Sequence, residues 1–268
     1  MPMREKSRVV AVEPSGEPAP GEGGFLTLVR MKYRNRYEDG SLSRPYLYEY
    51  IHRRGFDAVA IGLYFEQAGH PWMAYRPGIR VPVYFRRDLP LAVPDTRAYD
   101  LIPEAVAGSL EPQDRGVEGF LGRVVAEVWE EAGFRVTPGQ VEALGAGFFP
   151  SHGQSSEKIH LCAIRVDPAS SEPPEGDGSV NEADAPPIRF RPLREILLDC
   201  SKGIIEDPKV EILARRLSAR LGYLPELGRY AEPGERESML AFEHCLNAAG
   251  WFPLRDGAAA VTKREDST

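Results

Sequence analysis

The sequence contains no apolar run long enough to cross a bilayer. Its longest largely apolar stretch, "FDAVAIGLYF", has about ten residues, whereas a spanning helix needs about 20. Cysteine is scarce as well, and the three that occur (Cys162, Cys200 and Cys245) are odd in number and widely spaced, which fits neither a disulfide framework nor a zinc motif. The first 24 residues lack the apolar core of a signal peptide. We therefore expect a soluble, cytoplasmic protein without a membrane partner.

An excess of positive charge is also missing. The chain has 33 Lys and Arg against 40 Asp and Glu, which gives a net charge of −7 and a pI near 5.4. This balance argues against a broad face for nucleic acid, so we expect no nucleic-acid partner. An acidic protein that handles phosphates needs a metal ion or a few local arginines. The 42% apolar and 27% charged residues are typical of a globular chain with a sizeable core.

Composition and hydrophobic periodicity divide the 268 residues into four parts. Residues 1–24 are rich in Pro, Gly and Glu and predict a flexible segment, whereas residues 25–55 predict N-terminal strands with a possible role in dimerisation. Residues 56–221 form the expected main domain, and residues 222–268 a C-terminal helical extension. The order of strands, helix, strands and helix indicates the α+β class.

Within the main domain, residues 56–66 predict a buried strand, and residues 79–87 ("IRVPVYFRR") predict an edge strand because they contain Pro82. Residues 120–132 predict a helix that ends at Gly133. Residues 168–187 read as a long acidic loop. A second, amphipathic helix follows, with one apolar face made of Val210, Leu213, Leu217 and Leu221.

The helix over residues 120–132 carries three like charges within about a turn and a half. Its apolar residues share one face, and Glu127, Glu130 and Glu131 lie nearly opposite. Like charges three or four residues apart cost roughly 0.2–0.5 kcal/mol each on an exposed helix. The acidic face could therefore simply be solvated. Alternatively, the missing counter-charge is a divalent cation such as Mg²⁺ or Mn²⁺, which takes carboxylate oxygens and leaves positions open for phosphate oxygens.

The segment "EGFLGRVVAEVWEEAGF" resembles the Nudix box of the Nudix hydrolases. Glu118 stands at the first glutamate of that motif, and "EVWEEAGF" matches its second half position for position. The resemblance implies that Glu127, Glu130 and Glu131 bind the metal and that Glu118 is a supporting acid. Two positions depart from the motif. Ala126 replaces an arginine that pairs with a box glutamate, and Pro112 replaces the first glycine, for which Gly108 is an alternative.

Other segments resemble the ADP-ribose and nucleoside-diphosphate-sugar pyrophosphatase branch of that family. "EAVAG" resembles E-L-P-A-G, which implies that the carbonyl of Ala107 binds metal and that Glu104 lies near the nucleotide. "FFPSHGQSSEKIHLCAIRV" resembles the S-P-G-x-x-x-E loop and the strand after it, and implies substrate contacts at Ser151 and Gly153. Arg80 and Arg86 correspond to a strand where relatives contact phosphate. An ordinary hairpin loop and a solvated edge remain alternatives for these two segments.

The catalytic base is expected among the carboxylates. The resemblance places one on the long acidic loop, where Glu182 is our choice, with a box glutamate such as Glu130 as the alternative. Glu157 could be a further metal or base carboxylate, or merely a surface residue at the start of a strand. The acids of the loop could equally serve only to keep it solvated.

Taken together, the resemblance implies a Nudix-fold α/β/α sandwich with an N-terminal β extension and a C-terminal helical addition. The implied reaction is Mg²⁺- or Mn²⁺-dependent hydrolysis of the pyrophosphate in a nucleotide-derived small molecule, first ADP-ribose or a nucleotide sugar. It also implies a homodimer through exchanged N-terminal strands. Two alternatives stay open: a Nudix-fold module that only binds a nucleotide, which Ala126 favours, and a pyrophosphatase for coenzyme A or a dinucleotide.

Overall fold

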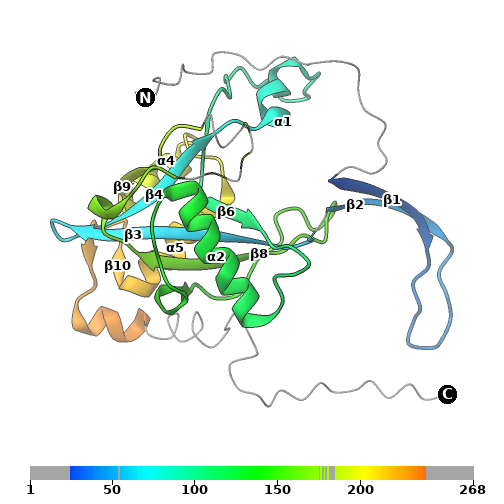
Figure 1. Cartoon of the computed structure of the whole chain (residues 1–268). Coiled ribbons are helices and arrows are strands. Elements are labelled where there is room, and N and C mark those ends of the chain that lie inside the picture. Colours follow the sequence, from blue (N-terminus) through cyan, green and yellow to red (C-terminus); the bar gives the residue numbers. More distant parts are fainter. Residues whose placement is uncertain are drawn as a thin grey trace.

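The computed structural model describes residues 25–239 except 54, 175, 177, 179 and 181–184. Within these residues a seven-stranded mixed sheet runs in the order β5-β4-β3-β8-β7, with β6 beside β3 and β9 beside β4. Helix α2 covers one face of this sheet, and α4 and α5 cover the other (Figure 1). The expected α+β class, with helices on both faces of a sheet, is confirmed. The bounds of these elements are β3 Ala58–Gln67, β4 His70–Gly78, β5 Ile102–Glu104, β6 Val106–Ser109, α2 Gly116–Ala132, β7 Glu142–Ala143, β8 Ile159–Arg165, β9 Arg189–Pro192, α4 Leu193–Ser201 and α5 Pro208–Leu221.

Strand β3 is buried on both faces, which explains its nearly continuous apolar sequence. Val59, Ile61 and Leu63 belong to the cluster packed under α2, whereas Ala60 and Tyr64 belong to the cluster under α4 and α5. Along one edge β3 pairs in parallel with β8. Along the other edge its first half pairs with β6 and its second half with β4. The short strand β6 is thereby held against the sheet directly beneath α2.

The two predicted helices of the main domain are confirmed. Helix α2 ends at Gly133, which has a positive φ of 69° and donates its N–H to the carbonyl of Trp129. A Cβ at Gly133 would lie 1.8 Å from the carbonyl oxygen of Glu172. Glycine is therefore also needed at this position so that the segment after β8 can pack against the end of the helix. In α5, Val210, Leu213 and Leu217 are fully buried, and Leu221 packs against the same cluster.

The expected edge strand over residues 79–87 is wrong. The segment forms the short helix α1 (Val81–Tyr84) and the 3₁₀ turn η1 (Phe85–Asp88). Pro82 lies in the first turn of α1, where a proline's missing N–H leaves no bond unmade. The strand of this region is β4, immediately before it, which the sequence analysis did not identify, like the short strands β5 and β6.

The region assigned to a C-terminal helical extension begins differently from the expectation. Two short strands, β10 (Tyr223–Leu224) and β11 (Arg229–Tyr230), pair with each other, and helix follows over residues 233–239. The rest of the expected C-terminal helix and the expected flexible segment 1–24 lie outside the described residues. Within the described part, no helix combines the length and apolar character needed to cross a membrane.

The N-terminal strands form a separate antiparallel hairpin of β1 (Leu26–Tyr33) and β2 (Tyr46–Arg53). Figure 1 shows this hairpin extending away from the main sheet. It is attached near its base, where the N–H of Ile51 donates to the carbonyl of Gln154 at 2.8 Å and the Tyr48 hydroxyl donates to that of Gly153 at 3.1 Å. Several of its large apolar side chains are exposed, including Leu26, Leu28, Met31, Tyr46, Leu47 and Tyr48.

Asp207 joins the start of α5 to the connection between β5 and β6. This buried carboxylate accepts hydrogen bonds from the N–H of Lys209 at 3.0 Å and the N–H of Ala105 at 3.1 Å. We predict that Asp207→Ala lowers the free energy of unfolding by about 2–4 kcal/mol, because a helix cap is lost and a buried N–H is left unpaired. Urea denaturation measures this change.

The control for this prediction is Asp167→Ala, which removes an exposed aspartate that caps the 3₁₀ turn η3 (Pro168–Ser170) with a 3.0 Å bond to the N–H of Ala169. We expect it to cost about 0.5 kcal/mol, as is usual for a surface position. Equal losses in the two variants would contradict the special role of Asp207.

Candidate functional site

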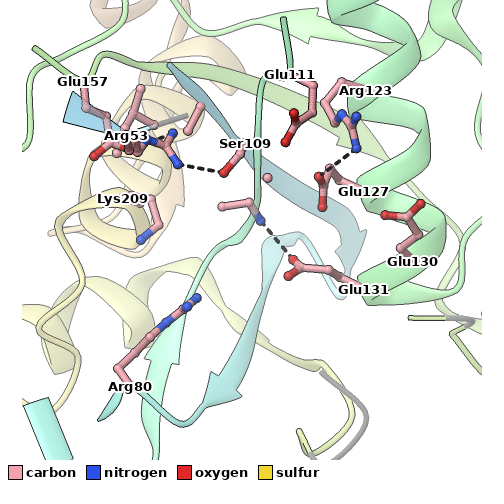
Figure 2. Close-up of a pocket in the computed structure, with 14 residues that line it drawn as sticks. Arg53, Arg80, Ser109, Glu111, Arg123, Glu127, Glu130, Glu131, Glu157 and Lys209 are labelled. Atoms are coloured by element: carbon pink, nitrogen blue, oxygen red, sulfur yellow. Dashed lines mark hydrogen bonds and ion pairs between the residues drawn. The ribbon is translucent and has the colours of Figure 1, made fainter. Parts of the chain in front are cut away.

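The acidic side of α2 and the strand β6 line the same cavity, which has a volume of about 440 Å³. Figure 2 shows that Glu127, Glu130 and Glu131 reach this cavity from α2 together with Arg123, while Arg53, Arg80 and Lys209 reach it from other elements. Three carboxylates of its wall thus come from one helix and three basic side chains come from distant segments, while Glu111 and Glu157 add carboxylates from outside the helix. The residues that line it are Arg53, Ala58, Arg80, Ala107, Gly108, Ser109, Glu111, Arg123, Glu127, Glu130, Glu131, Glu157, Ile159 and Lys209.

The glutamates of α2 do not form a solvated face. Glu127 is 8% exposed and Glu131 is 9% exposed, whereas Glu130 is of intermediate exposure. Gly108 of β6 makes room for this arrangement, since a Cβ at that position would lie 1.8 Å from Oε1 of Glu127. The chain thus brings the carboxylate of Glu127 against a strand that has no side chain at the point of contact. The solvated alternative is wrong for Glu127 and Glu131.

Both oxygens of Glu131 have donors. Its Oε2 accepts the N–H of Ala107 at 3.0 Å, and its Oε1 lies 2.7 Å from Nη1 of Arg76 on β4. Glu127 faces Arg123, one turn earlier on α2, with 3.7 Å between Oε1 and Nη1. A buried carboxylate requires such partners, because removal from water costs several kcal/mol per ion.

Arg53, at the end of β2, belongs to the basic part of the wall. It donates to the Ser109 hydroxyl at 2.7 Å and pairs with Glu157 at 2.9 Å, so it links the hairpin, β6 and the start of β8. Lys209, in the first turn of α5, lies 3.0 Å from Oδ1 of Asp207. These cations stand across the cavity from the glutamates of α2 (Figure 2).

Two arginines of the cavity have shifted pKa values. Burial alone would lower the pKa of Arg80, but the hydrogen bond and charge of Glu104, with the charges of Glu131 and Asp207, raise it overall. For Arg123, burial is likewise opposed by Asp114 and by the charges of Glu127 and Glu130, and its pKa is raised. Both guanidinium groups therefore stay charged at any physiological pH.

The donor set fits a hard divalent cation in its chemistry. Carboxylates from three residues of one helix and the main chain of Ala107 border the same cavity, and Mg²⁺ prefers oxygen ligands of this kind. Among the described residues, however, no three His, Cys, Asp or Glu side chains stand close enough together to hold an ion as they are. A cation bound here would share the carboxylate oxygens with the guanidinium groups that already contact them, Arg76 at Glu131 and Arg123 at Glu127.

The structure brings about half of the predicted site residues together. Glu127, Glu130, Glu131, Ala107, Glu157 and Arg80 all line the cavity. Glu104 does not line it but holds Arg80, with Nε 2.8 Å from each carboxylate oxygen. The metal, catalytic and substrate-binding roles assigned to these residues stay predictions.

The other predicted residues lie elsewhere. Glu118 is exposed near the start of α2, and Arg86 pairs with Asp95 at 2.9 Å; neither lines the cavity. Ser151 and Gly153 form an exposed turn beside the base of the hairpin and are also outside the cavity lining. Glu182, our choice for the base, lies outside the described residues.

Sequence reasoning missed several residues of the cavity. Arg53, Ser109, Glu111 and Lys209 come from segments that carried no local motif, whereas Arg123 lies within the box segment itself. Arg123 had the clearest signal, because it stands four residues before Glu127 on the same helix, a spacing that favours an ion pair. Arg53 and Lys209 are separated by most of the domain, and only the folded sheet brings them to one cavity.

Comparisons with known proteins give a fold likeness only. No protein-family model and no curated protein matches the chain. Among solved structures, one titled "Crystal structure of ADP compounds hydrolase" aligns with a TM-score of 0.46 and 16% identity, over 82% of this chain and 100% of its own. A NUDIX hydrolase from Alicyclobacillus acidocaldarius aligns with a TM-score of 0.43 and 10% identity, over 66% of this chain and 97% of its own.

Proposed function

We propose that this chain is a Nudix-fold hydrolase that cleaves the pyrophosphate bond of a nucleoside diphosphate derivative. The observation that carries the proposal is the burial of Glu127 and Glu131 at a cavity whose other side is basic. A helix with a structural role alone rarely buries such glutamates, because burying a charge is costly. A helix that presents carboxylates to a metal ion, opposite cations that attract phosphate, has a chemical reason to bury them.

In this proposal the carboxylates of Glu127, Glu130 and Glu131, with the carbonyl of Ala107, hold Mg²⁺ or Mn²⁺. Such an ion supplies neutralisation of the phosphate oxygens and a lowered pKa for a bound water. Arg80 and Lys209 line the cavity and attract the diphosphate. Arginine suits this task because its planar fork can bind two phosphate oxygens at once.

The chemical step adds a water oxygen to one phosphorus atom and breaks the bridging P–O bond. The proton of the water passes to a carboxylate, and a nucleoside monophosphate and a sugar phosphate leave. Within the described residues, Glu130 and Glu157 are the cavity carboxylates proposed for this proton. Glu182 stays the candidate from the long acidic loop. ADP-ribose and nucleotide sugars are the substrate class, on the strength of the motifs around Glu104 and Ser151.

A second function, nucleotide binding without turnover, has one specific observation in its favour. Arginines hold the carboxylates of Glu127 and Glu131, and Ala126 stands where the box motif has an arginine. A chain that had lost hydrolysis could keep the same cavity as a binding site. Activity measured beside binding separates the two functions.

We predict that the purified protein releases AMP from ADP-ribose, or a monophosphate from a nucleotide sugar, with Mg²⁺ or Mn²⁺ and not with EDTA. Glu130→Gln should lower kcat about 100-fold or more, as expected when a catalytic carboxylate is lost. Glu130 suits this test because it is less buried than Glu131, so its replacement disturbs the fold less. Chromatographic separation of the nucleotide products measures both results.

The matched control is Glu226→Gln, since the side chain of Glu226 is exposed and lies outside the cavity. It should turn over substrate at the wild-type rate. Tight nucleotide binding without any product from ADP-ribose or a nucleotide sugar would favour the binding function instead. Turnover that Glu130→Gln and Glu131→Gln leave intact, in folded variants, would contradict the site.

We also propose that two copies of this chain associate through the β1–β2 hairpin. A two-stranded hairpin alone is marginally stable in water. One of its faces carries Leu28 and Leu47, and the other carries Met31 and Tyr48, all four exposed in the single chain. A second copy of the chain would cover at least one of these faces.

We predict a particle of twice the 29.7 kDa chain mass by light scattering after gel filtration. One variant, Leu28→Lys with Leu47→Lys, and a second, Met31→Lys with Tyr48→Lys, each place charge on one face. At least one of them should elute as a monomer, while Ser41→Lys in the exposed turn stays dimeric. A monomeric wild type, or two dimeric face variants, would rule out this interface.

A further inference from the structure

Two arginines, one on β4 and one just after it, pair with glutamates near the cavity. The two pairs differ in which partner lines the cavity. In the first pair Arg80 lines the cavity and its partner Glu104 does not. In the second pair Glu131 lines the cavity and its partner Arg76 does not. Arg80 is thus a side chain offered to a ligand, whereas Arg76 is placed behind a side chain that is offered.

The pair of Arg76 and Glu131 is well buried and joins two fixed elements. The side chains are 12% and 8% exposed, with 2.7 Å between Nη1 and Oε1. Arg76 lies on β4, where it stands opposite Glu104 of β5, and β4 also pairs with β3 and β9. Glu131 lies in the last turn of α2. The contact therefore connects the main sheet to the helix that carries the acidic part of the cavity.

Arg76 and the main chain of β6 share the task of holding this carboxylate. Arg76 contacts Oε1, and the N–H of Ala107 donates to Oε2 at 3.0 Å. A glutamate side chain has several rotatable bonds and would otherwise sample many orientations. With one donor on each oxygen, from two different strands, the plane of the carboxylate is fixed.

We propose that Arg76 is a positioning residue for Glu131 and contacts neither substrate nor metal. It sets the direction in which the carboxylate meets the cavity, and its effect on catalysis rests on the proposed hydrolase function. A displacement of about 1 Å in a catalytic group can cost about 100-fold in rate. Loss of Arg76 should therefore act on kcat and on metal affinity, and leave substrate affinity nearly unchanged.

The test compares Arg76→Gln and Arg76→Lys with Arg80→Gln in the full chain. Arg76→Gln should lower kcat about 10- to 100-fold with KM within about threefold of wild type. In calorimetry with Mn²⁺ and no substrate, it should also weaken Mn²⁺ binding several-fold. Arg76→Lys should have a kcat and an Mn²⁺ affinity between those of wild type and Arg76→Gln, because an ammonium supplies the charge without the planar fork. Arg80→Gln should instead raise KM and leave Mn²⁺ binding unchanged.

Three results would overturn this proposal. A raised KM with unchanged Mn²⁺ affinity in Arg76→Gln would make Arg76 a substrate contact. Tighter Mn²⁺ binding would mean that Arg76 restrains Glu131 from the metal. Normal kcat and Mn²⁺ affinity in folded Arg76→Gln would mean that the pair has no role in the site.

A double-mutant cycle keeps the proposal testable even if the protein hydrolyses nothing and binds no Mn²⁺, results that count against the proposed function alone. If Arg76 holds Glu131, the double variant Arg76→Gln/Glu131→Gln should have an unfolding midpoint no lower than that of the less stable single variant. Fully additive losses would show that the two side chains do not depend on each other, and the positioning role would then be wrong.

Discussion

The burial of the Glu127 and Glu131 carboxylates between α2 and β6 is the constraint on which the rest of the site depends. Taking an ion out of water costs several kcal/mol, and the cost is offset only where charged or N–H partners stand close. Here the partners are Arg123 on the helix, Arg76 on β4 and the N–H of Ala107 on β6. These contacts fix the acidic side of α2 against two strands of the main sheet, β4 and β6.

The sheet topology explains how this contact is possible. Because β3 pairs with β6 along its first half and with β4 along its second half, one continuous strand carries both partners of α2. The main-chain N–H of Ala107 and the side chain of Arg76 thus come from neighbours on the same edge of β3. Gly108 then lets the helix approach, since any side chain there would collide with Glu127. A short strand with little side-chain bulk is what brings carboxylates and main chain together.

The elements and site residues that could be predicted from the sequence are those with a signal in a few consecutive residues. The glutamate spacing, the terminating Gly133 and the apolar face of α5 are properties of a few consecutive turns, and the structure agrees with them. The edge strand predicted over residues 79–87 was wrong for a local reason too. An apolar run that contains Pro82 suits an edge strand or the first turn of a helix equally well. The strands β5 and β6 are too short for a period of two to be recognised.

On the basic side of the cavity Arg80 was predicted from a resemblance, but Arg53 and Lys209 had no such signal because they come from distant elements. Partners from distant elements also matter for Ala126, which replaces the arginine of the box motif and weakened the hydrolase interpretation. A motif records only the charges carried by its own helix, whereas a carboxylate responds to any guanidinium within reach. In this fold Arg76 of β4 stands 2.7 Å from Glu131. The acidic helix therefore has a guanidinium partner from outside the motif, although the arginine of the motif itself is replaced by Ala126.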